Sequence, residues 1–159
     1  MIRDEMLADL LQSDLQELLS VSYIVLANNQ VTNRHIEKRY RMPVQCWSAL
    51  YVVDRFPGLL ARDVQRLLPR PQNTISRAVS LLQARALIRT EEDPQDGRAR
   101  RLYPTPEGAT LLAQILTTAR ARQAEVFGVL TDDERRQFAA LCHKIAAGPL
   151  LTRSDVMPD

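Results

Sequence analysis

The stretch from Leu59 to Thr105 decides the fold, and it reads LLARDVQRLLPRPQNTISRAVSLLQARALIRTEEDPQDGRARRLYPT. Its apolar spacing predicts a short helix over Leu59–Leu68, a proline-rich turn and a longer helix over 72–86. Two short strands, Leu87–Glu92 and Arg98–Tyr103, should follow. Because an Asp-Gly pair favours a tight turn, we expect the loop over 93–97 to close a hairpin.

The longer helix has one apolar face and one polar face. Ile75, Val79, Leu82 and Ala86 recur at spacings of three and four, so they predict a single buried stripe. The opposite face has no Glu or Lys, although an ordinary solvated helix, the alternative interpretation, is usually rich in both. Its amides, hydroxyls and arginine suit base edges and phosphates. The candidate DNA contacts of this helix and the turn before it are Arg70, Gln72, Asn73, Thr74, Ser76, Arg77 and Ser80.

The charge of the chain is concentrated in this central stretch. From Arg55 to Arg101, ten arginines stand against five acidic residues, a net of +5, whereas the whole chain carries only +2. The flanking segments are therefore mildly acidic. A basic middle between acidic ends indicates a local binding surface for a polyanion, and nucleic acid is the expected partner.

Composition limits the other classes of function. The 159 residues are 45% apolar and 25% charged, which suits one folded domain with helical extensions. No segment approaches the ~20 apolar residues of a membrane span, and the N-terminus lacks the pattern of a signal peptide. Two cysteines without a CxxC spacing indicate a reducing, cytoplasmic setting. The chain has no HExxH, GxxxxGK[ST] or GxSxG motif, so we expect no enzyme, no metal and no cofactor.

Helices are expected on both sides of the central stretch. Before it we expect helices over 4–19, 21–41 and Val44–Asp54. After it, Thr105-Pro106 predicts one helix start, and Thr131 with Glu134 forms the capping box of a last helix over 132–147. The class is mainly α with a small β-hairpin (α+β). The predicted organisation is N-terminal dimerisation helices at 1–42, a winged helix-turn-helix DNA-binding region at 43–105, C-terminal dimerisation helices at 106–148 and a flexible tail at 149–159.

Leu-rich helices at both ends are more apolar than a monomer of this size needs. They predict a homodimer in which the ends meet across a two-fold axis. Two recognition helices about 34 Å apart would then fit successive major grooves on one face of a duplex.

Three motifs in the central stretch occur in a fixed order. They are Thr74-Ile75-Ser76-Arg77, the loop from Asp93 to Leu102 with Asp96 and Arg98, and the helix start Thr105-Pro106-Glu107-Gly108. Together with the helix order over residues 20–147, they resemble the winged helix-turn-helix regulators of the MarR family.

This resemblance implies that the helix at 71–86 enters the major groove and that the loop at 93–98 is the wing. Arg98 takes the position of the family's minor-groove arginine, and Asp96 the position of an acid that holds it in place. Arg100 completes the candidate wing contacts. Ala86 stands where the family often has glycine, so this helix must end without the usual left-handed glycine.

The leading hypothesis is a prokaryotic, cytoplasmic and nucleoid-associated repressor that binds double-stranded DNA at a palindromic operator. The resemblance suggests that a small aromatic or phenolic ligand releases it, with His35, Cys46 and Trp47 as candidate ligand contacts. A buried core role is the alternative for each of these three residues. Alternative functions are a redox sensor using Cys46, a non-specific architectural DNA binder, and a winged-helix module that binds protein.

Overall fold

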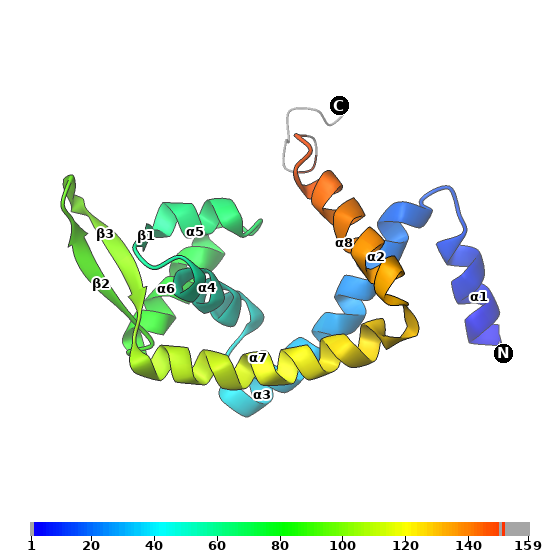
Figure 1. Cartoon of the computed structure of the whole chain (residues 1–159), viewed down its shortest axis with the longest axis horizontal. Coiled ribbons are helices and arrows are strands. Elements are labelled where there is room, and N and C mark those ends of the chain that lie inside the picture. The colour runs from blue at the N-terminus through cyan, green and yellow to red at the C-terminus, as the bar shows by residue number, and fades with distance from the viewer. Residues whose placement is uncertain (1, 150, 152–159) are drawn as a thin grey trace. The chain divides into compact units, whose positions relative to one another are not determined.

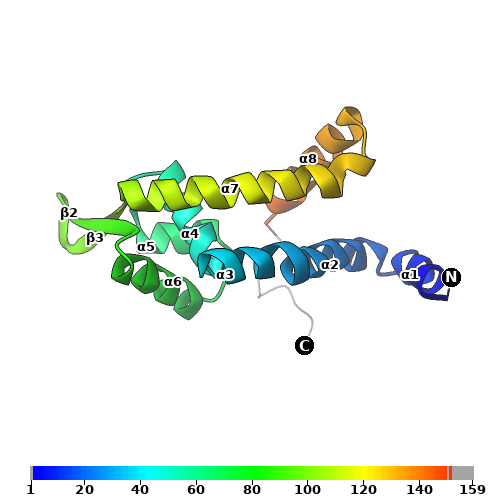
Figure 2. The ribbon, with the colours of Figure 1, turned by 90° about the horizontal axis from the view of Figure 1, so that it is seen from below.

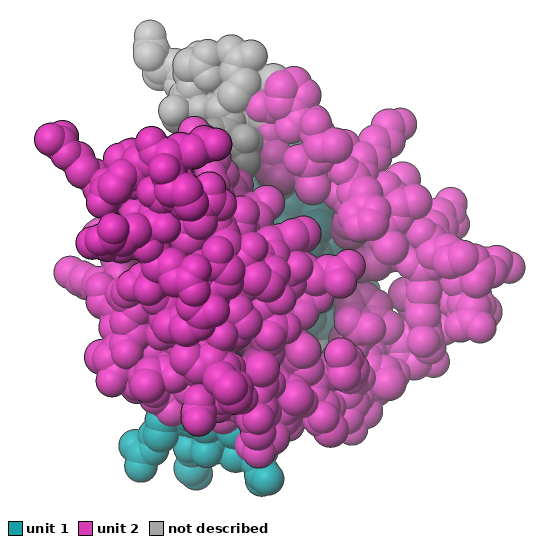
Figure 3. Space-filling model, turned by 60° about the vertical axis from the view of Figure 1, so that its left-hand side comes forward, with its two compact units in different colours: residues 1–44 teal, residues 45–159 magenta. Residues whose placement is uncertain are grey.

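The computed structural model describes residues 2–149 and 151, which form two compact units, Met1–Val44 and Gln45–Asp159 (Figure 1, Figure 3). The predicted class is confirmed, because helices dominate and a small antiparallel sheet accompanies them. The tail predicted at 149–159 lies almost entirely outside the described residues. None of the helices within the described part of the chain combines the length and the apolar character that a membrane crossing requires.

The described part of the first unit consists of helices joined by short turns. It contains α1 (Ile2–Leu11), α2 (Gln16–Asn28), a π-helical turn (Asn29–Asn33) and α3 (Arg34–Tyr40). The prediction of one helix over 4–19 was wrong, because the chain turns between α1 and α2. There the Ser13 hydroxyl accepts the main-chain N–H of Leu15 at 3.4 Å, and a serine that bonds locally in this way competes with the helical ladder.

The second unit begins with three helices around one core. They are α4 (Val44–Arg55), α5 (Ala61–Leu67) and α6 (Gln72–Ala84), and they lie together beside the hairpin in both ribbon views (Figure 1, Figure 2). The fully buried side chains of this unit come from helices and strands alike, so the sheet belongs to the same core. These side chains include Leu50, Val53, Val64, Ile75, Leu82, Leu102, Leu112 and Ile115.

The sheet has one strand more than the sequence predicted. Its order is β1 (Leu59–Leu60), β3 (Asp96–Pro104), β2 (Ile88–Asp93), all antiparallel. The helix expected over Leu59–Leu68 therefore starts two residues later than predicted. A two-residue strand is too short to show alternation, and it exists only because β3 supplies its partners from far along the chain.

The hairpin turn lies earlier than the Asp96-Gly97 pair suggested. Asp93 and Asp96 are paired, so Pro94 and Gln95 form the turn, and Gly97 has no left-handed conformation. Proline favours the second position of a turn and aspartate the first, and the Asp93 carboxylate accepts the Gln95 N–H at 2.8 Å. These local preferences outweigh the Asp-Gly signal.

Helix α6 ends in a left-handed residue even though that residue is not glycine. Ala86 has φ of 53°. The Ala86 N–H bonds to the Gln83 carbonyl and the Leu87 N–H to the Leu82 carbonyl, both at 2.9 Å, which is a Schellman motif. Ala86 is also exposed, so its predicted place in the buried stripe was wrong, and Ala78 takes part in that stripe instead.

Two helices complete the unit, and both begin as the sequence predicted. In α7 (Pro106–Val126), Thr105 is the N-cap and accepts the Gly108 N–H at 3.0 Å. A 3₁₀ turn (Phe127–Val129) leads to α8 (Asp132–Ala146), where Thr131 and Glu134 form the predicted capping box. Hydrogen bonds from the Thr131 main chain and hydroxyl lower the pKa of the Glu134 carboxyl.

Candidate nucleic-acid interface

Helix α6 presents its polar face to solvent because its apolar face is fixed in the core. Ile75, Ala78, Val79 and Leu82 are buried. The exposed residues of the candidate surface are Arg70, Gln72, Asn73, Ser76, Arg77 and Ser80, and Thr74 is half-buried. The polar face thus lies where an approaching ligand can reach it.

Most polar groups on this face are free to bind something else. The Ser80 hydroxyl donates to the Ser76 carbonyl at 3.0 Å, which leaves its oxygen as an acceptor. The side chains of Gln72 and Arg77 make no hydrogen bond or ion pair within the described residues. The first turn of α6 also lacks a side-chain cap, since Pro71 occupies the N-cap position. Within the described residues, the main-chain N–H groups of Gln72 and Asn73 therefore stay open at the start of the helix, where an anion is stabilised.

The predicted wing arginine stands in an irregular part of β3. The register passes from Asp93 opposite Asp96 to Glu92 opposite Arg100, so residues 97–99 have no partner across the hairpin. Arg98 is exposed, and among the described residues its guanidinium forms no ion pair. Asp96 accepts the main-chain N–H of Arg98 at 3.0 Å. The acid expected to hold this arginine therefore contacts its backbone.

Other arginines of the hairpin are paired within the protein. Arg100 contacts Glu92 at 2.7 Å, with both side chains exposed. Arg89 pairs with Glu91 and lies over the Tyr103 ring at 4.7 Å. Exposed pairs of this kind contribute little free energy, so a phosphate can replace the carboxylate. Arg100, a predicted DNA contact, must therefore leave Glu92 before it can bind a phosphate, whereas Arg98 has no ion pair to break within the described residues.

Sequence reasoning missed Arg62, at the start of α5. It is exposed and makes no ion pair within the described residues. With Arg98, Arg100 and Gln83 it lines a surface cleft of about 390 Å³ between α5, α6 and the sheet. The only sequence signal for Arg62 as a DNA contact is its place in the first turn of the helix before α6.

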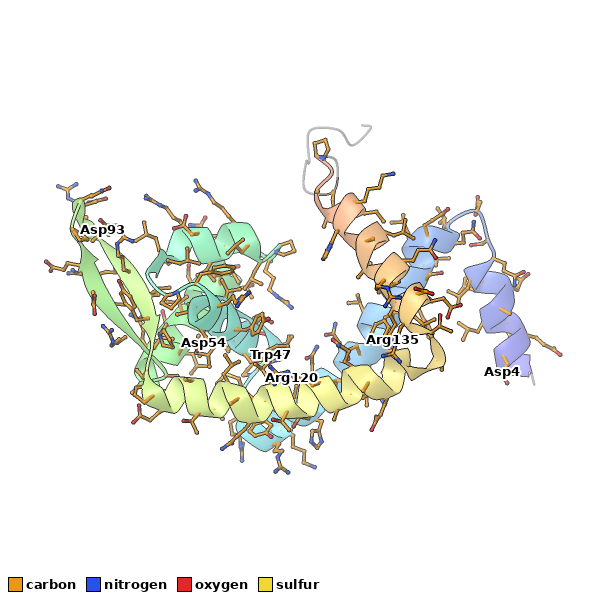
Figure 4. All side chains as sticks on the ribbon, viewed as in Figure 1. Asp4, Trp47, Asp54, Asp93, Arg120 and Arg135 are labelled. Carbon is orange, nitrogen blue, oxygen red and sulfur yellow. The ribbon has the colours of Figure 1, made fainter. Side chains whose placement is uncertain are left out.

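Sequence reasoning also missed the ion pair between the buried Asp93 and the half-buried Arg101. The Arg101 Nη2 lies 2.9 Å from the Asp93 carboxylate, whose side chain is 6% exposed. Figure 4 labels Asp93 near the tip of the hairpin. The hydrogen bond from the Gln95 N–H, together with Arg101, lowers the pKa of Asp93 despite the opposing effect of burial. No sequence pattern identifies this pair.

The three predicted effector contacts differ in their surroundings. His35 is exposed on α3 in the first unit. In the second unit, Cys46 is buried on α4, an environment unlike that of exposed, reactive thiols. Trp47 is half-buried, and its indole N–H is buried without a hydrogen-bond partner in the described part of the chain. Among the residues that the structure describes, no cluster of His, Cys, Asp and Glu could hold a metal ion.

Comparisons with known proteins point to one family. Residues 42–99 match the model of the MarR family. A transcriptional regulator of Escherichia coli O111:H-, HosA, is 31% identical over 72 residues, which are 45% of this chain and 53% of HosA. The match thus spans about half the length of that relative.

Solved structures extend the likeness over most of the chain. The crystal structure of MarR is 25% identical, with a TM-score of 0.67, and covers 84% of this chain and 96% of its own. A MarR-family regulator from Silicibacter pomeroyi is also 25% identical, with a TM-score of 0.74, and covers 86% of this chain and 92% of its own.

Proposed function

We propose that the chain is a MarR-family transcription regulator that binds double-stranded DNA with sequence specificity. The observation that carries this proposal is the solvent-facing side of α6. It offers amides, hydroxyls and one unpaired arginine, and no acid occurs anywhere in the helix. An α-helix fits the major groove, where these groups can pair with base edges.

The wing supplies a second kind of contact. An unpaired arginine on an irregular hairpin tip can enter a narrow minor groove, where the negative potential is enhanced. Arg98 takes this role, while Asp96 orders its backbone. Arg62 and Arg70 bind phosphates, which fix register without reading sequence. Both are exposed and unpaired within the described residues, which supports this role.

The acting form is a homodimer, in which 1–42 and 106–148 supply the contacts. Helix α2 buries none of its residues within a single chain, although Leu18 and Leu26 are 69% and 63% exposed. Helix α8 buries none either, and Ile145 is 60% exposed. Apolar side chains left open on this scale mark protein interfaces. A dimer also provides two copies of α6 for an inverted-repeat operator.

The regulated step is repression, relieved by a small aromatic or phenolic effector. The buried and unpartnered indole N–H of Trp47 supports this part, because such a donor is stabilised by a bound acceptor. His35 and Cys46 stay predicted contacts. Trp47 fluorescence titrated with a panel of phenolic carboxylates should change for ligands that also release DNA. If no ligand does both, the effector proposal fails. As a DNA-binding regulator, the protein acts at the nucleoid, in the cytoplasm of a prokaryote.

Selection from a random duplex pool with the full-length protein tests the proposal. We expect the recovered duplexes to share an inverted repeat. Arg98→Ala should then cost about 1–3 kcal/mol of binding free energy, the usual worth of a specific arginine contact. Arg77→Ala and Thr74→Ala should relax base preference in the half-sites. Recovered duplexes with no shared sequence would overturn the assignment.

A further inference from the structure

Asp93 is a buried carboxylate near the tip of the hairpin, although its chain neighbours Glu92 and Pro94 are exposed (Figure 4). One of its oxygens, Oδ1, accepts the N–H of Gln95 in the turn at 2.8 Å. The other, Oδ2, receives the Arg101 guanidinium at 2.9 Å. Both carboxylate oxygens are thus used, one toward the turn and one toward the central strand. A buried carboxylate with two partners resists displacement, because removing either partner leaves a desolvated charge.

Arg101 connects this carboxylate to the turn that precedes β1. Its Nη1 donates to the Gly58 carbonyl at 3.2 Å, while Nη2 holds Asp93. Gly58 lies in the turn before β1 with φ of 90°, and its own N–H bonds to the Leu102 carbonyl at 2.8 Å. The planar guanidinium of Arg101, on β3, therefore links Asp93 at the end of β2 to the turn that precedes β1.

The neighbouring pair of Arg100 and Glu92 provides a contrast within the same hairpin. Its side chains are 51% and 72% exposed, against 36% and 6% for Arg101 and Asp93. Solvent screens the exposed pair, so its arginine can exchange the acid for a phosphate. Arg101 cannot do so without abandoning a buried acid. Arg100 is therefore available to bind DNA, whereas its neighbour Arg101 holds the hairpin together.

Arg98 depends on what holds the hairpin tip. The segment 97–99 has no partner strand opposite it. Apart from the Asp96 bond to the Arg98 main chain, the constraints on this segment are the closure of the turn and the anchoring of the strand that follows. Asp93 takes part in both. When a DNA-contacting residue lies on a mobile loop, ordering that loop on binding costs entropy and weakens affinity. A loop that is already fixed avoids this cost.

We propose that Asp93 and Arg101 are positioning residues of the wing, which fix the hairpin tip so that Arg98 meets DNA already in place. This inference rests on the proposed function for the part that concerns DNA. The order of the free wing does not depend on it, and the two parts can be tested separately.

The first experiment measures amide hydrogen exchange in the full-length protein without DNA. Asp93→Asn keeps an acceptor for the Gln95 N–H but removes the charge that holds Arg101. We expect the amides of 95–99 to exchange about fivefold faster or more, since the tip opens locally. Glu92→Gln, the matched change in the exposed pair, should leave their exchange within about twofold. Unchanged exchange in Asp93→Asn would overturn the proposal. Arg101→Lys keeps the charge but cannot contact Gly58 and Asp93 at once, so we expect it to speed the exchange of 95–99 as Asp93→Asn does.

The second experiment measures affinity for the tightest duplex recovered from the random pool. Removing an acid from a DNA-binding surface should raise affinity if charge alone mattered. Positioning predicts the opposite, a fall of about five- to tenfold in Asp93→Asn, which is part of the loss expected for a missing arginine contact.

Making Asp93→Asn in the Arg98→Ala protein as well as in the wild type shows whether the loss of affinity acts through Arg98. In Arg98→Ala protein, Asp93→Asn should change affinity by less than about twofold, because the residue that it positions is gone. An equal loss in both backgrounds would overturn the proposal. Failure of the wild-type protein to select any duplex would refute the proposed function instead, and hydrogen exchange would still decide whether Asp93 and Arg101 order the tip.

Discussion

Replacing Gly108 by alanine should destabilise the protein, although alanine is the better helix former. Gly108 lies in the first turn of α7, where a Cβ would stand 2.0 Å from the Leu87 carbonyl oxygen and 2.9 Å from its carbon. Both are backbone atoms, so no rotamer change can relieve the clash. The start of α7 must move away from the end of α6.

The magnitude follows from what this movement breaks. The Thr105 hydroxyl donates to the Ala86 carbonyl at 2.7 Å, and the Thr105 N–H to the Leu87 carbonyl at 3.1 Å. Each bond contributes about 1 kcal/mol, and forced overpacking costs about 1–3 kcal/mol. Alanine returns about 1 kcal/mol of helix propensity. The expected net loss is about 2–4 kcal/mol of unfolding free energy.

Urea unfolding followed by circular dichroism, at one protein concentration, measures this loss. Gly128→Ala is the matched control, because a Cβ there meets no atom within 4 Å. It should change the unfolding free energy by less than about 1 kcal/mol. If Gly108→Ala proved as stable as the wild type, the close contact between α7 and Leu87 would be refuted.

Three further predictions concern stability. Ala86→Gly should stabilise the protein by about 0.5–1 kcal/mol in urea unfolding, since glycine relieves the left-handed strain, while Ala84→Gly inside the helix should destabilise it. Thr131→Ala should cost about 1 kcal/mol through loss of the α8 cap; an unchanged urea midpoint would show that the cap contributes nothing. The pKa of Asp93 is lower in the folded than in the unfolded protein, so ionised Asp93 adds to the free energy of unfolding above the unfolded pKa. This contribution is lost as the pH falls below about 4. The difference in urea midpoint between wild type and Asp93→Asn should therefore shrink from pH 6 toward pH 3, and a constant difference would contradict this account.

Features encoded in a few neighbouring residues could be predicted from the sequence. The spacing of Ile75, Val79 and Leu82 fixed the orientation of α6, and therefore which side chains of the candidate site face solvent. The hydroxyls of Thr105 and Thr131 marked two helix starts within one residue. Each signal is a short-range preference that the core does not oppose.

Features that depend on distant residues could not be predicted. Strand β1 exists because β3 pairs with it, and Arg101 reaches Gly58 across 43 positions. Ala86 shows a related limit, because its left-handed conformation is imposed by the chain entering β2 against its own preference. The sequence therefore indicated which residues the wing exposes and left open what holds the wing in place.

The central claim is that α6 reads base sequence in a duplex. Equilibrium binding of the full-length protein to its selected duplex and to a scrambled duplex of equal composition, from about 50 to 200 mM salt, tests it most directly. Both affinities should fall with salt while the selected duplex stays at least about 10³-fold tighter. Equal affinities would indicate an architectural binder, and the absence of salt-dependent duplex binding would indicate a protein-binding module; either result would contradict the claim.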